Sequence, residues 1–480
     1  MDKNFSTKSF IIISSQGWGI KNFLLSNFCN YFEKNTTIYF FSPINKILKE
    51  SPINNSKVPN VIFNRLIKHR SNWLQKKLEI RRNLYHFVLC ETDTMKIKLL
   101  RATKYYNSFQ NNLNRFSIFL AQLIKSRGLI SLIDKAYIFL SKKTLNAKYY
   151  YEQFKKIRPE LIISSFYIDK NEWIPLIVAK SMKIKTIIAI NSWDNLSSKS
   201  RVPILPDYFF VWSGHMKQEV LSYYPEFDEE NILICGAPQF DFHLNNFLIK
   251  NHDAFISKYN LKKNRKTIFY AGVTPGLMPH EDKIVIDILN AIKNNQINGN
   301  PNFILRLHPK DGGSRYNYIK KLYPYLNIII PNEINNGNVE NWTPTTHDQN
   351  ILVDLIKYSD IIINVASTIT IDSAIFDKPI INPCYDHIDN SKNSPGLRIY
   401  DYTHYANIKK SKGVQIAKSR NEMISFINNY LDNPELDSSG RKKIVKSICG
   451  DMKFEASLVM SENIKNMISK EKITKIKQYA

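Results

Sequence analysis

Basic side chains recur at every second position near residue 306 of this 480-residue chain. Residues 303–307 are apolar except for Arg306, which is typical of a buried strand, and the two-residue period of a strand places Arg306, His308 and Lys310 on one face. Cations beside a buried strand are costly unless an anion satisfies them, and a phosphate or diphosphate would do so. The alternative interpretation is a buried structural ion pair, for example with Asp311.

A second phosphate-compatible loop is predicted where an apolar strand, residues 360–364, meets a helix. Ser367 and Thr368 open this helix, so their hydroxyls and the free backbone N–H groups of its first turn suit a phosphate. Asp372, about one turn further on, could accept a hydrogen bond from a ribose hydroxyl. The alternative is that Ser367 or Thr368 caps the helix, a role that is compatible with ligand binding.

Glycine-containing loops follow the first strand of each half of the chain. Gly272 and Thr274 lie in a run of small residues, and small residues at the junction of a strand and a helix suit a phosphate. Gly17 and Gly19 form a tight turn, which lets a ligand or a neighbouring backbone approach closely. The third glycine of a dinucleotide fingerprint is missing there, so a plain strand–helix turn is an equal alternative.

Polar residues crowd after the strand that ends at Ile190. Asp194 could act as a general base, Asn195 could hold a hydroxyl group, and Lys199 could bind a phosphate or carboxylate. With Trp193, this group is richer than a turn requires. The carboxyl end of a buried strand is where open α/β sheets bind ligands, although Asp194 could instead cap the following segment.

These candidate sites need two parallel sheets to position them. Short, β-branched apolar runs recur between amphipathic segments, as in doubly wound α/β domains whose strands are buried on both faces. The Asn- and Lys-rich stretch 245–265 separates two such sets. We therefore expect a first domain over residues 1–250 and a second over 262–460, followed by a basic tail over 461–480.

The stretch 62–158 departs from this alternation, because strand signals nearly vanish and a basic helical pattern takes over, as in a helical insert. Residues 61–160 contain 21 Lys and Arg against 6 Asp and Glu, more than half of the excess behind the formal net charge of +25. Such a local excess suits an anionic partner, either a membrane or nucleic acid. A solvated basic face and a general preference for lysine are the alternatives.

The cysteines and the hydropathy of the chain indicate the cellular compartment in which it is expected. The five cysteines are widely spaced without a CxxC pair, which favours neither a disulfide framework nor a zinc site, so a reducing cytoplasm is expected. No stretch reaches about 18 uninterrupted apolar residues, the length of a membrane span. We therefore expect a chain that does not cross a membrane but could lie on one.

Taken in order, these motifs resemble those of glycosyltransferases with the GT-B fold, most closely the bacterial surface-polysaccharide and CDP-glycerol glycerophosphotransferase-like branch. The motifs that carry the resemblance are Arg306-Leu-His-Pro309, Asp354 with Tyr358 to Asp360, Ser367-Thr368 with Asp372, Lys378-Pro379, Ser192 to Lys199, Leu205-Pro-Asp207, Val211-Trp212, and Gly236-Ala-Pro with Phe240-Asp241. One departure is the Asp-Tyr-Ser-Ser loop of teichoic-acid polymerases, which is replaced here by Asn364 to Thr368.

The resemblance implies two Rossmann-like domains with a cleft between them, and a crossing helix near the C-terminus for which residues 454–464 are the candidate. The donor would sit against the second domain, bound by Gly272, Thr274, Arg306, His308, Lys310, Ser367, Thr368 and Asp372. The acceptor side, in the first domain, would comprise Gly17, Gly19, Trp193, Asn195 and Lys199, with Asp194 as the base of an inverting enzyme.

The implied reaction moves a sugar or a polyol phosphate from a nucleotide-sugar or CDP-polyol donor to a glycan or lipid-linked acceptor. GT-B enzymes neutralise the leaving diphosphate with basic residues and helix N-termini, and the chain has no Asp-x-Asp motif, so neither a metal nor a cofactor is expected. Lipid-linked acceptors lie at the inner membrane face, where a basic helical segment would suit peripheral contact with anionic lipids.

Two other functions stay open. A UDP-sugar 2-epimerase has the same architecture and would need no separate acceptor. A non-enzymatic basic protein could bind a membrane or nucleic acid through residues 62–158, where Tyr105, Tyr106, Phe109 and Phe116 accompany the basic residues. No recognisable nucleic-acid-binding module is present in the sequence, so nucleic acid is not expected as a partner.

Overall fold

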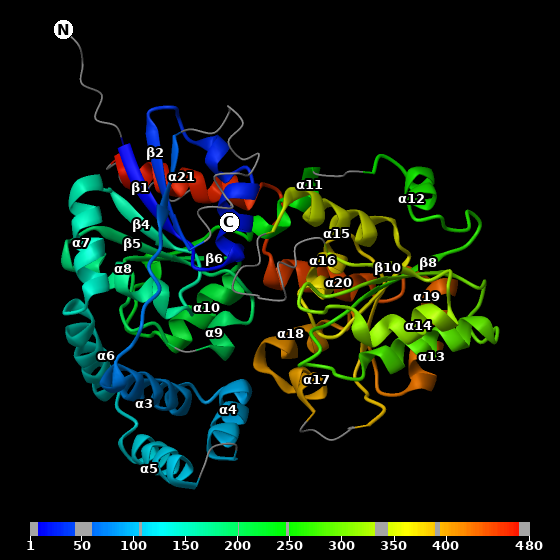
Figure 1. Ribbon diagram of the computed structural model, residues 1–480, viewed down its shortest axis with the longest axis horizontal. Coiled ribbons are helices and arrows are strands. Elements are labelled where there is room, and N and C mark those ends of the chain that lie inside the picture. Colours follow the sequence, from blue (N-terminus) through cyan, green and yellow to red (C-terminus); the bar gives the residue numbers. More distant parts are fainter. Residues whose placement is uncertain are drawn as a thin grey trace. The chain divides into compact units, whose positions relative to one another are not determined.

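The computed structural model describes residues 8–43, 60–104, 108–199, 201–245, 249–331, 344–388 and 394–469 (Figure 1). The chain divides into two compact units. Unit 1 comprises Met1–Gln239 together with Gly450–Ala480, and unit 2 comprises Phe240–Cys449. Each unit contains one parallel sheet with helices, so the predicted α/β class with two doubly wound domains is confirmed.

Unit 1 has a seven-stranded sheet in the order β3-β2-β1-β4-β5-β6-β7, and all neighbouring strands are parallel. Its strands are β1 (Lys8–Ile13), β2 (Thr36–Ser42), β3 (Val61–Arg65), β4 (Leu161–Ser164), β5 (Lys185–Ala189), β6 (Tyr208–Val211) and β7 (Ile232–Ile234). The strand order reverses between β1 and β4. Doubly wound sheets bind ligands at such a reversal, beyond the carboxyl ends of the strands.

The two ends of the chain contribute to one core in unit 1. Phe10 and Ile12 of β1 pack in a cluster with Met460 and Ile464 of the C-terminal helix α21 (Ala456–Ser469). Burial of strands on both faces explains their continuous apolar sequences. The other helices of this unit outside the connection from β3 to β4 are α1 (Gly17–Gly19), α8 (Lys170–Ser181), α9 (Asn195–Ser198) and α10 (Gly214–Tyr223).

The described residues between β3 and β4 form five helices: α3 (Trp73–Cys90), α4 (Asp93–Lys104), α5 (Ser108–Ile124), α6 (Arg127–Lys142) and α7 (Leu145–Ile157). They agree with the predicted helical pattern from residue 73 onward, while the role of this segment as an insert stays a prediction. Its start is corrected, because residues 61–65 form the strand β3, which pairs with β2. The helices begin at a capping box in which Asn72 and Gln75 exchange side-chain to backbone hydrogen bonds.

Unit 2 has a six-stranded parallel sheet in the order β10-β9-β8-β11-β12-β13, which reverses between β8 and β11. Its strands are β8 (Thr267–Ala271), β9 (Asn302–Arg306), β10 (Asn327–Ile329), β11 (Ile361–Asn364), β12 (Ile380–Pro383) and β13 (Gln415–Ala417). Its helices are α11 (Phe242–Asn245), α12 (His252–Lys258), α13 (Glu281–Lys293), α14 (Asn317–Leu322), α15 (Thr346–Tyr358), α16 (Ile369–Ile375), α17 (Pro395–Arg398), α18 (Thr403–Ser411), α19 (Arg420–Asp432) and α20 (Ser438–Ile448).

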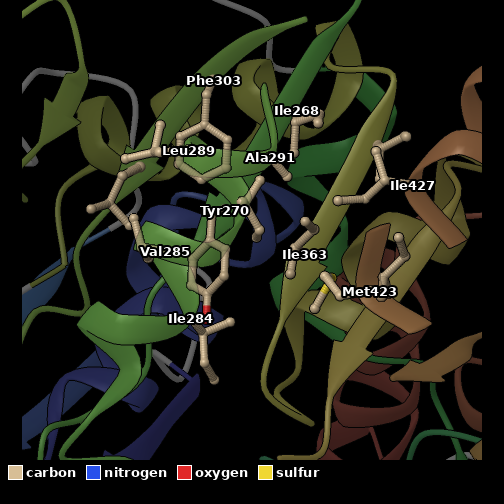
Figure 2. Close-up of a cluster of buried hydrophobic side chains, with 14 of the residues drawn as sticks. Ile268, Tyr270, Ile284, Val285, Leu289, Ala291, Phe303, Ile363, Met423 and Ile427 are labelled. Carbon is tan, nitrogen blue, oxygen red and sulfur yellow. The ribbon is translucent and has the colours of Figure 1, made fainter. Parts of the chain in front are cut away.

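Both faces of the unit 2 sheet are covered by helices. Ile268 and Tyr270 of β8 belong to one cluster with side chains of α13 and α19, and Figure 2 shows Tyr270 beside Ile284 of α13. The alternate residue Phe269 joins a second cluster on the opposite face, with residues of α12 and α15. A central strand whose successive side chains enter two cores must be apolar throughout, which is why β8 was predictable.

Between β1 and β2 the chain forms a π-helical turn, Ile20–Leu25, and a 3-10 turn, Phe28–Tyr31. Two further predictions about the fold are corrected. The boundary between the units lies at Gln239 and Phe240 rather than between 250 and 262. Residues 461–469 are part of the helix α21 rather than of a basic tail, and residues 470–480 lie outside the described part of the chain.

Candidate functional site

The loops that follow β8, β9 and β11 lie side by side at one edge of the unit 2 sheet, because these three strands are parallel neighbours. They carry most of the predicted donor-binding residues: Gly272 and Thr274 after β8, His308 and Lys310 after β9, and Ser367 and Thr368 after β11. The topology therefore brings these residues to the same edge. Their role in donor binding stays a prediction.

Arg306, the last residue of β9, is engaged in a buried ion pair. Its Nη2 donates to Asp348 Oδ2 at 2.7 Å, and both side chains are buried. The structural ion pair considered above is thus present, but its partner is Asp348 rather than Asp311. Arg306 Nη1 has no hydrogen-bond partner among the described residues, so this buried guanidinium keeps the capacity to bind an anionic ligand.

His308 is not a cation near neutral pH. Burial, reinforced by the charge of Lys310, lowers the pKa of His308 to about 4. His308 Nδ1 accepts the backbone N–H of Lys310 at 3.0 Å, so the neutral ring carries its proton on Nε2 and offers a hydrogen-bond donor there. The prediction of three cations on one strand face is corrected, because β9 ends at Arg306 and only the exposed Lys310 is an unburied cation.

Gly272 lies where two backbones approach closely. Its N–H donates to the Arg306 carbonyl at 2.8 Å, and a Cβ at this position would lie 3.2 Å from the same oxygen. Thr274 lies in the following turn, where its carbonyl accepts the N–H of Leu277 at 2.9 Å. The close approach to β9 is therefore sufficient reason for a glycine at position 272.

A buried network that sequence reasoning missed holds the same loop in place. Glu281, in the first turn of α13, accepts the N–H of Val273 at 3.0 Å and the hydroxyl of Tyr316 at 2.9 Å. Arg315 Nη2 lies 2.7 Å from Glu281 Oε2, donates to the Val273 carbonyl, and also contacts Asp311. Burial raises the pKa of Glu281, while Arg315 acts in the opposite direction.

Asn364, the last residue of β11, organises the loop that leads into α16. Its Oδ1 accepts hydrogen bonds from the Ser367 N–H at 3.2 Å and from the hydroxyls of Ser367 and Thr370 at 3.0 Å. Ser367 Oγ accepts the N–H of Ile369, as a cap would, whereas Thr368 makes no side-chain cap. The buried Asn364 Nδ2 has no partner among the described residues, so a second N–H donor is available at this edge.

Asp372 is buried on α16, where its Oδ1 lies 2.8 Å from His243 Nε2. His243 comes from α11 and also lies against the ring of Phe376. The carboxylate is therefore in contact with the protein, and the proposed contact with a ribose hydroxyl stays a prediction. His404, in the same unit, is buried on α18.

In unit 1, Asp194 is the centre of the loop that follows β5. Its carboxylate accepts hydrogen bonds from the Ser192 hydroxyl at 2.5 Å, the Ser198 hydroxyl at 3.0 Å and the Asn195 amide at 3.2 Å, and Lys199 Nζ lies 3.3 Å away. Asp194 occupies the N-cap position of α9, but its side chain makes no capping hydrogen bond to the backbone of that helix. The structure thus brings three of the predicted residues together.

Other ionisable groups surround this loop, and sequence reasoning did not single them out. Lys98 of α4 donates to the Ser198 carbonyl, and burial together with the charge of Lys199 lowers the pKa of Lys98 to about 8. Burial raises the pKa of Glu219 on α10 to about 8, and the charge of Asp194 adds to this shift. Trp193, one of the predicted residues, is buried.

Gly17 and Gly19 form the short helix α1 after β1. A Cβ on Gly19 would clash with the hydroxyls of Ser14 and Ser165, so the packing of two loops is sufficient reason for this glycine. The predicted contact of these glycines with an acceptor stays a prediction.

Glu172 of α8 ties together the loops that follow β1 and β4. This fully buried carboxyl accepts the N–H of Ser15 at 2.7 Å, the Ser164 hydroxyl at 2.7 Å and the N–H of Phe166 at 2.9 Å. Burial raises the pKa of Glu172 to about 7, against the effect of these hydrogen bonds. No sequence motif marks Glu172, since a glutamate in the first turn of a helix is usually exposed.

Several buried oxygen atoms at this edge of the unit 1 sheet have no hydrogen-bond partner among the described residues. They are Ser165 Oγ after β4, and Asn191 Oδ1, Asn195 Oδ1 and Ser197 Oγ after β5. A buried oxygen without a donor is costly, so these atoms suit a ligand that is rich in hydroxyl groups.

The described residues contain neither a candidate metal-binding cluster nor a candidate membrane span. No group of three His, Cys, Asp or Glu side chains in this part of the chain is placed to hold a metal ion. None of its helices combines the length and the apolar character that a membrane span requires.

A family model described as CDP-Glycerol:Poly(glycerophosphate) glycerophosphotransferase matches residues 181–452, more than half of the chain. This range contains the Asp194 loop of unit 1 and the loops after β8, β9 and β11 of unit 2. No curated protein sequence matches the chain.

Solved structures share the fold at low sequence identity. A Listeria monocytogenes protein, provisionally assigned as a UDP-N-acetylglucosamine 2-epimerase, matches with a TM-score of 0.56, 8% identity and coverage of 98% of both chains. The UDP-GlcNAc 2-epimerase from Neisseria meningitidis, bound to UDP-GlcNAc, matches with a TM-score of 0.53, 12% identity and coverage of 96% of this chain and 100% of that chain. The wall teichoic acid polymerase TagF matches with a TM-score of 0.49, 14% identity and coverage of 97% of this chain and 90% of that chain. The likeness to the first two shows the fold.

Proposed function

Because the chain belongs to the CDP-glycerol:poly(glycerophosphate) glycerophosphotransferase family, we propose that it moves a polyol phosphate from a CDP-polyol donor to a hydroxyl group of a lipid-linked or glycan acceptor. Family membership makes the chain a transferase that uses a nucleotide-activated donor, as predicted. The observation that carries the finer proposal is the extent of the family match, which includes every predicted donor-binding residue. Sugar transfer from a nucleotide sugar is the alternative within the same fold.

In the proposed reaction, the acceptor oxygen forms a bond to the phosphorus that carries the polyol. The bond from this phosphorus to the bridging oxygen breaks, and its electron pair stays on that oxygen, so cytidine monophosphate leaves. Lys310, the Nε2–H of His308 and the Nη1–H of Arg306 would stabilise the charge that develops on the leaving group. Asn364 Nδ2 and the hydroxyls of Ser367 and Thr368 would complete the donor site.

The proton of the acceptor hydroxyl would pass to Asp194, which would act as the general base. Support comes from its surroundings, since the Ser192 and Ser198 hydroxyls and the Asn195 amide fix the carboxylate in one orientation. The unpartnered buried oxygen atoms after β4 and β5 would accept hydrogen bonds from acceptor hydroxyls.

The transfer should need no divalent metal, because side chains of unit 2 would supply the positive charge at the leaving group. We expect the transfer rate to be the same with a chelator and with added Mg²⁺. A rate that depends on Mg²⁺ would contradict this part of the proposal and leave the donor assignment standing.

Contact with a membrane follows from the same proposal. Lipid-linked acceptors lie at an anionic membrane face, and the local excess of basic residues within 62–158 would favour that location. If neutralising these residues left the distribution of the protein in cell fractions unchanged, peripheral contact through this segment would be wrong.

The donor assignment is tested by calorimetry with CDP-glycerol, other CDP-polyols and UDP-GlcNAc. We expect a CDP-polyol to bind, and Lys310→Ala to weaken its affinity about tenfold or more through the loss of a charge-assisted contact. Lys320→Ala is the matched control, because Lys320 is also an exposed lysine and lies on α14 of the same unit. Turnover of UDP-GlcNAc without an acceptor would favour a 2-epimerase instead.

Arg306 requires a different design, because its removal leaves Asp348 buried without a partner. The double variant Arg306→Ala, Asp348→Asn removes both charges, and Asp348→Asn alone is its control. We expect donor affinity to fall in the double variant and to be kept in the control. Equal affinity in both proteins would exclude Arg306 from the donor site.

A further inference from the structure

The helix α5 turns an apolar side toward solvent. Phe116, Phe119, Leu120, Leu123 and Ile124 occupy positions i, i+3, i+4, i+7 and i+8, which places them on one side of the helix. Their exposed fractions are 59%, 55%, 38%, 66% and 50%, respectively. We refer to these five side chains as the α5 stripe.

The opposite side of α5 is the one that packs on the protein, and it is less apolar. Asn114 and Ala121 are buried there, and Ile118 is partly buried. Ala121 packs in a small cluster with Tyr85 and Val88 of α3. A surface helix of a globular protein usually buries its most apolar side. Packing among the described residues of the chain therefore does not account for the α5 stripe.

The sequence segment that contains the stripe carries only positive charge, and the acidic groups near it come from outside the segment. Residues 94–133 contain seven basic residues and no acidic residue. Arg115 is exposed on α5 itself, and Lys125 and Arg127 follow at the end of the stripe with side chains about half exposed. Two acidic groups from outside this range reach them, Glu91 at 2.6 Å from Lys125 and Glu226 at 3.8 Å from Arg127.

We propose that α5 lies in the surface of an anionic bilayer, with the α5 stripe among the acyl chains and its basic neighbours at the lipid phosphates. A second copy of the chain could also cover the stripe, but it would bring two regions of like charge together, which opposes association. This inference deepens the proposed function and rests on it, because the contact would give the enzyme access to a lipid-linked acceptor.

The test is sedimentation of the full chain with vesicles of phosphatidylglycerol and phosphatidylethanolamine, compared with phosphatidylcholine alone. We expect binding to the anionic vesicles, and a loss of about tenfold or more in the partition coefficient of Phe119→Ser, Leu123→Ser. The control Leu322→Ser, Tyr325→Ser removes two side chains of unit 2 that are 64% and 73% exposed, and its binding should equal that of the wild type. Lys125→Gln, Arg127→Gln should weaken binding at low salt more than at high salt.

Equal partition of the stripe variant and the wild type, or no binding of the wild type to anionic vesicles, would overturn the inference. So would a dimeric wild type that becomes monomeric in the stripe variant by light scattering, because the stripe would then be an interface between copies. Calorimetry with CDP-glycerol on the same proteins separates the two proposals. If vesicle binding depended on the stripe but CDP-glycerol did not bind, the proposed function would be refuted and the bilayer-binding surface would stand. If CDP-glycerol bound but vesicle binding did not depend on the stripe, only the bilayer-binding surface would be refuted.

Discussion

Units 1 and 2 each place a fully buried glutamate beside the point where the strand order reverses. Glu172 accepts the N–H of Ser15 in the loop after β1, and Glu281 accepts the N–H of Val273 in the loop after β8. The two glutamates differ in their other partners. Glu281 faces Arg315 at 2.7 Å, whereas the hydrogen bonds of Glu172 come from two backbone N–H groups and the Ser164 hydroxyl. In both units a buried glutamate thus accepts a loop N–H group. Its carboxylate faces an arginine in unit 2, whereas in unit 1 it has only neutral hydrogen-bond donors among the described residues.

The same contrast recurs in the groups that lack partners. At the edge of the unit 2 sheet they are N–H donors, Arg306 Nη1 and Asn364 Nδ2. At the edge of the unit 1 sheet they are oxygen atoms, such as those of Asn191 and Asn195. Donors suit an anionic ligand and acceptors suit a ligand rich in hydroxyl groups. The comparison therefore agrees with a donor phosphate at unit 2 and an acceptor at unit 1.

The largest expected effect comes from breaking the ion pair of unit 2. Arg315→Ala leaves Glu281 buried without its cation, so we expect the free energy of unfolding to fall by about 3–5 kcal/mol at neutral pH. Urea unfolding of the full chain measures it. Adding Glu281→Gln should recover part of the loss, since the uncompensated charge is removed. If the free energy of unfolding fell by less than about 1 kcal/mol, the ion pair with Arg315 would not be what stabilises the buried Glu281.

A smaller effect, with a defined pH dependence, is expected at Glu172. Burial raises its pKa from the ordinary value to about 7, so the folded state holds this proton more tightly than the unfolded state. The contribution of Glu172 to the free energy of unfolding therefore falls as pH rises from about 4.5 to about 7, by up to about 3 kcal/mol. The difference between wild type and Glu172→Gln, followed across this range, isolates it. A difference independent of pH would show that Glu172 is ionised throughout.

The smallest change in the free energy of unfolding should come from His308, and its dependence on pH should be opposite to that of Glu172. The pKa of His308 is lowered to about 4, so the unfolded state binds the proton more tightly. The contribution of His308 is complete above about pH 6.5 and is lost as pH falls toward about 4, by about 1–2 kcal/mol for a partly exposed ring. His308→Asn keeps an acceptor for the Lys310 N–H and removes the titration. Wild type and variant should diverge only in acid, and parallel curves would contradict the lowered pKa.

The strands that could be predicted from the sequence are those buried on both faces. β8 and β11 are continuous apolar runs, because helices cover both sides of the unit 2 sheet. β3 was missed because none of its residues is fully buried, so a polar Asn64 and Arg65 interrupt its apolar pattern. β13 has three residues, which is too short for a periodic signal.

Several residues that lie together at one sheet edge could be selected from the sequence, but not their partners, and the roles of these residues stay predictions. Arg306 stands out in a strand, whereas Asp348 is a long way off in sequence at the start of α15, and no local pattern links the two. The same holds for Asp372 and His243. Glu172 and Glu281 look like ordinary acidic residues of a first helical turn, because the burial that raises their pKa values comes from elements distant in the sequence.

The helix α21 carries a consequence for the order of folding during synthesis. It follows all of unit 2 in the chain, yet Met460 and Ile464 belong to the core of unit 1, and Glu455 just before it binds Tyr31 at 2.8 Å. Unit 2 is one continuous stretch and can fold as it leaves the ribosome. Unit 1 begins first but must wait for its last helix, so the half that is translated earlier is completed later.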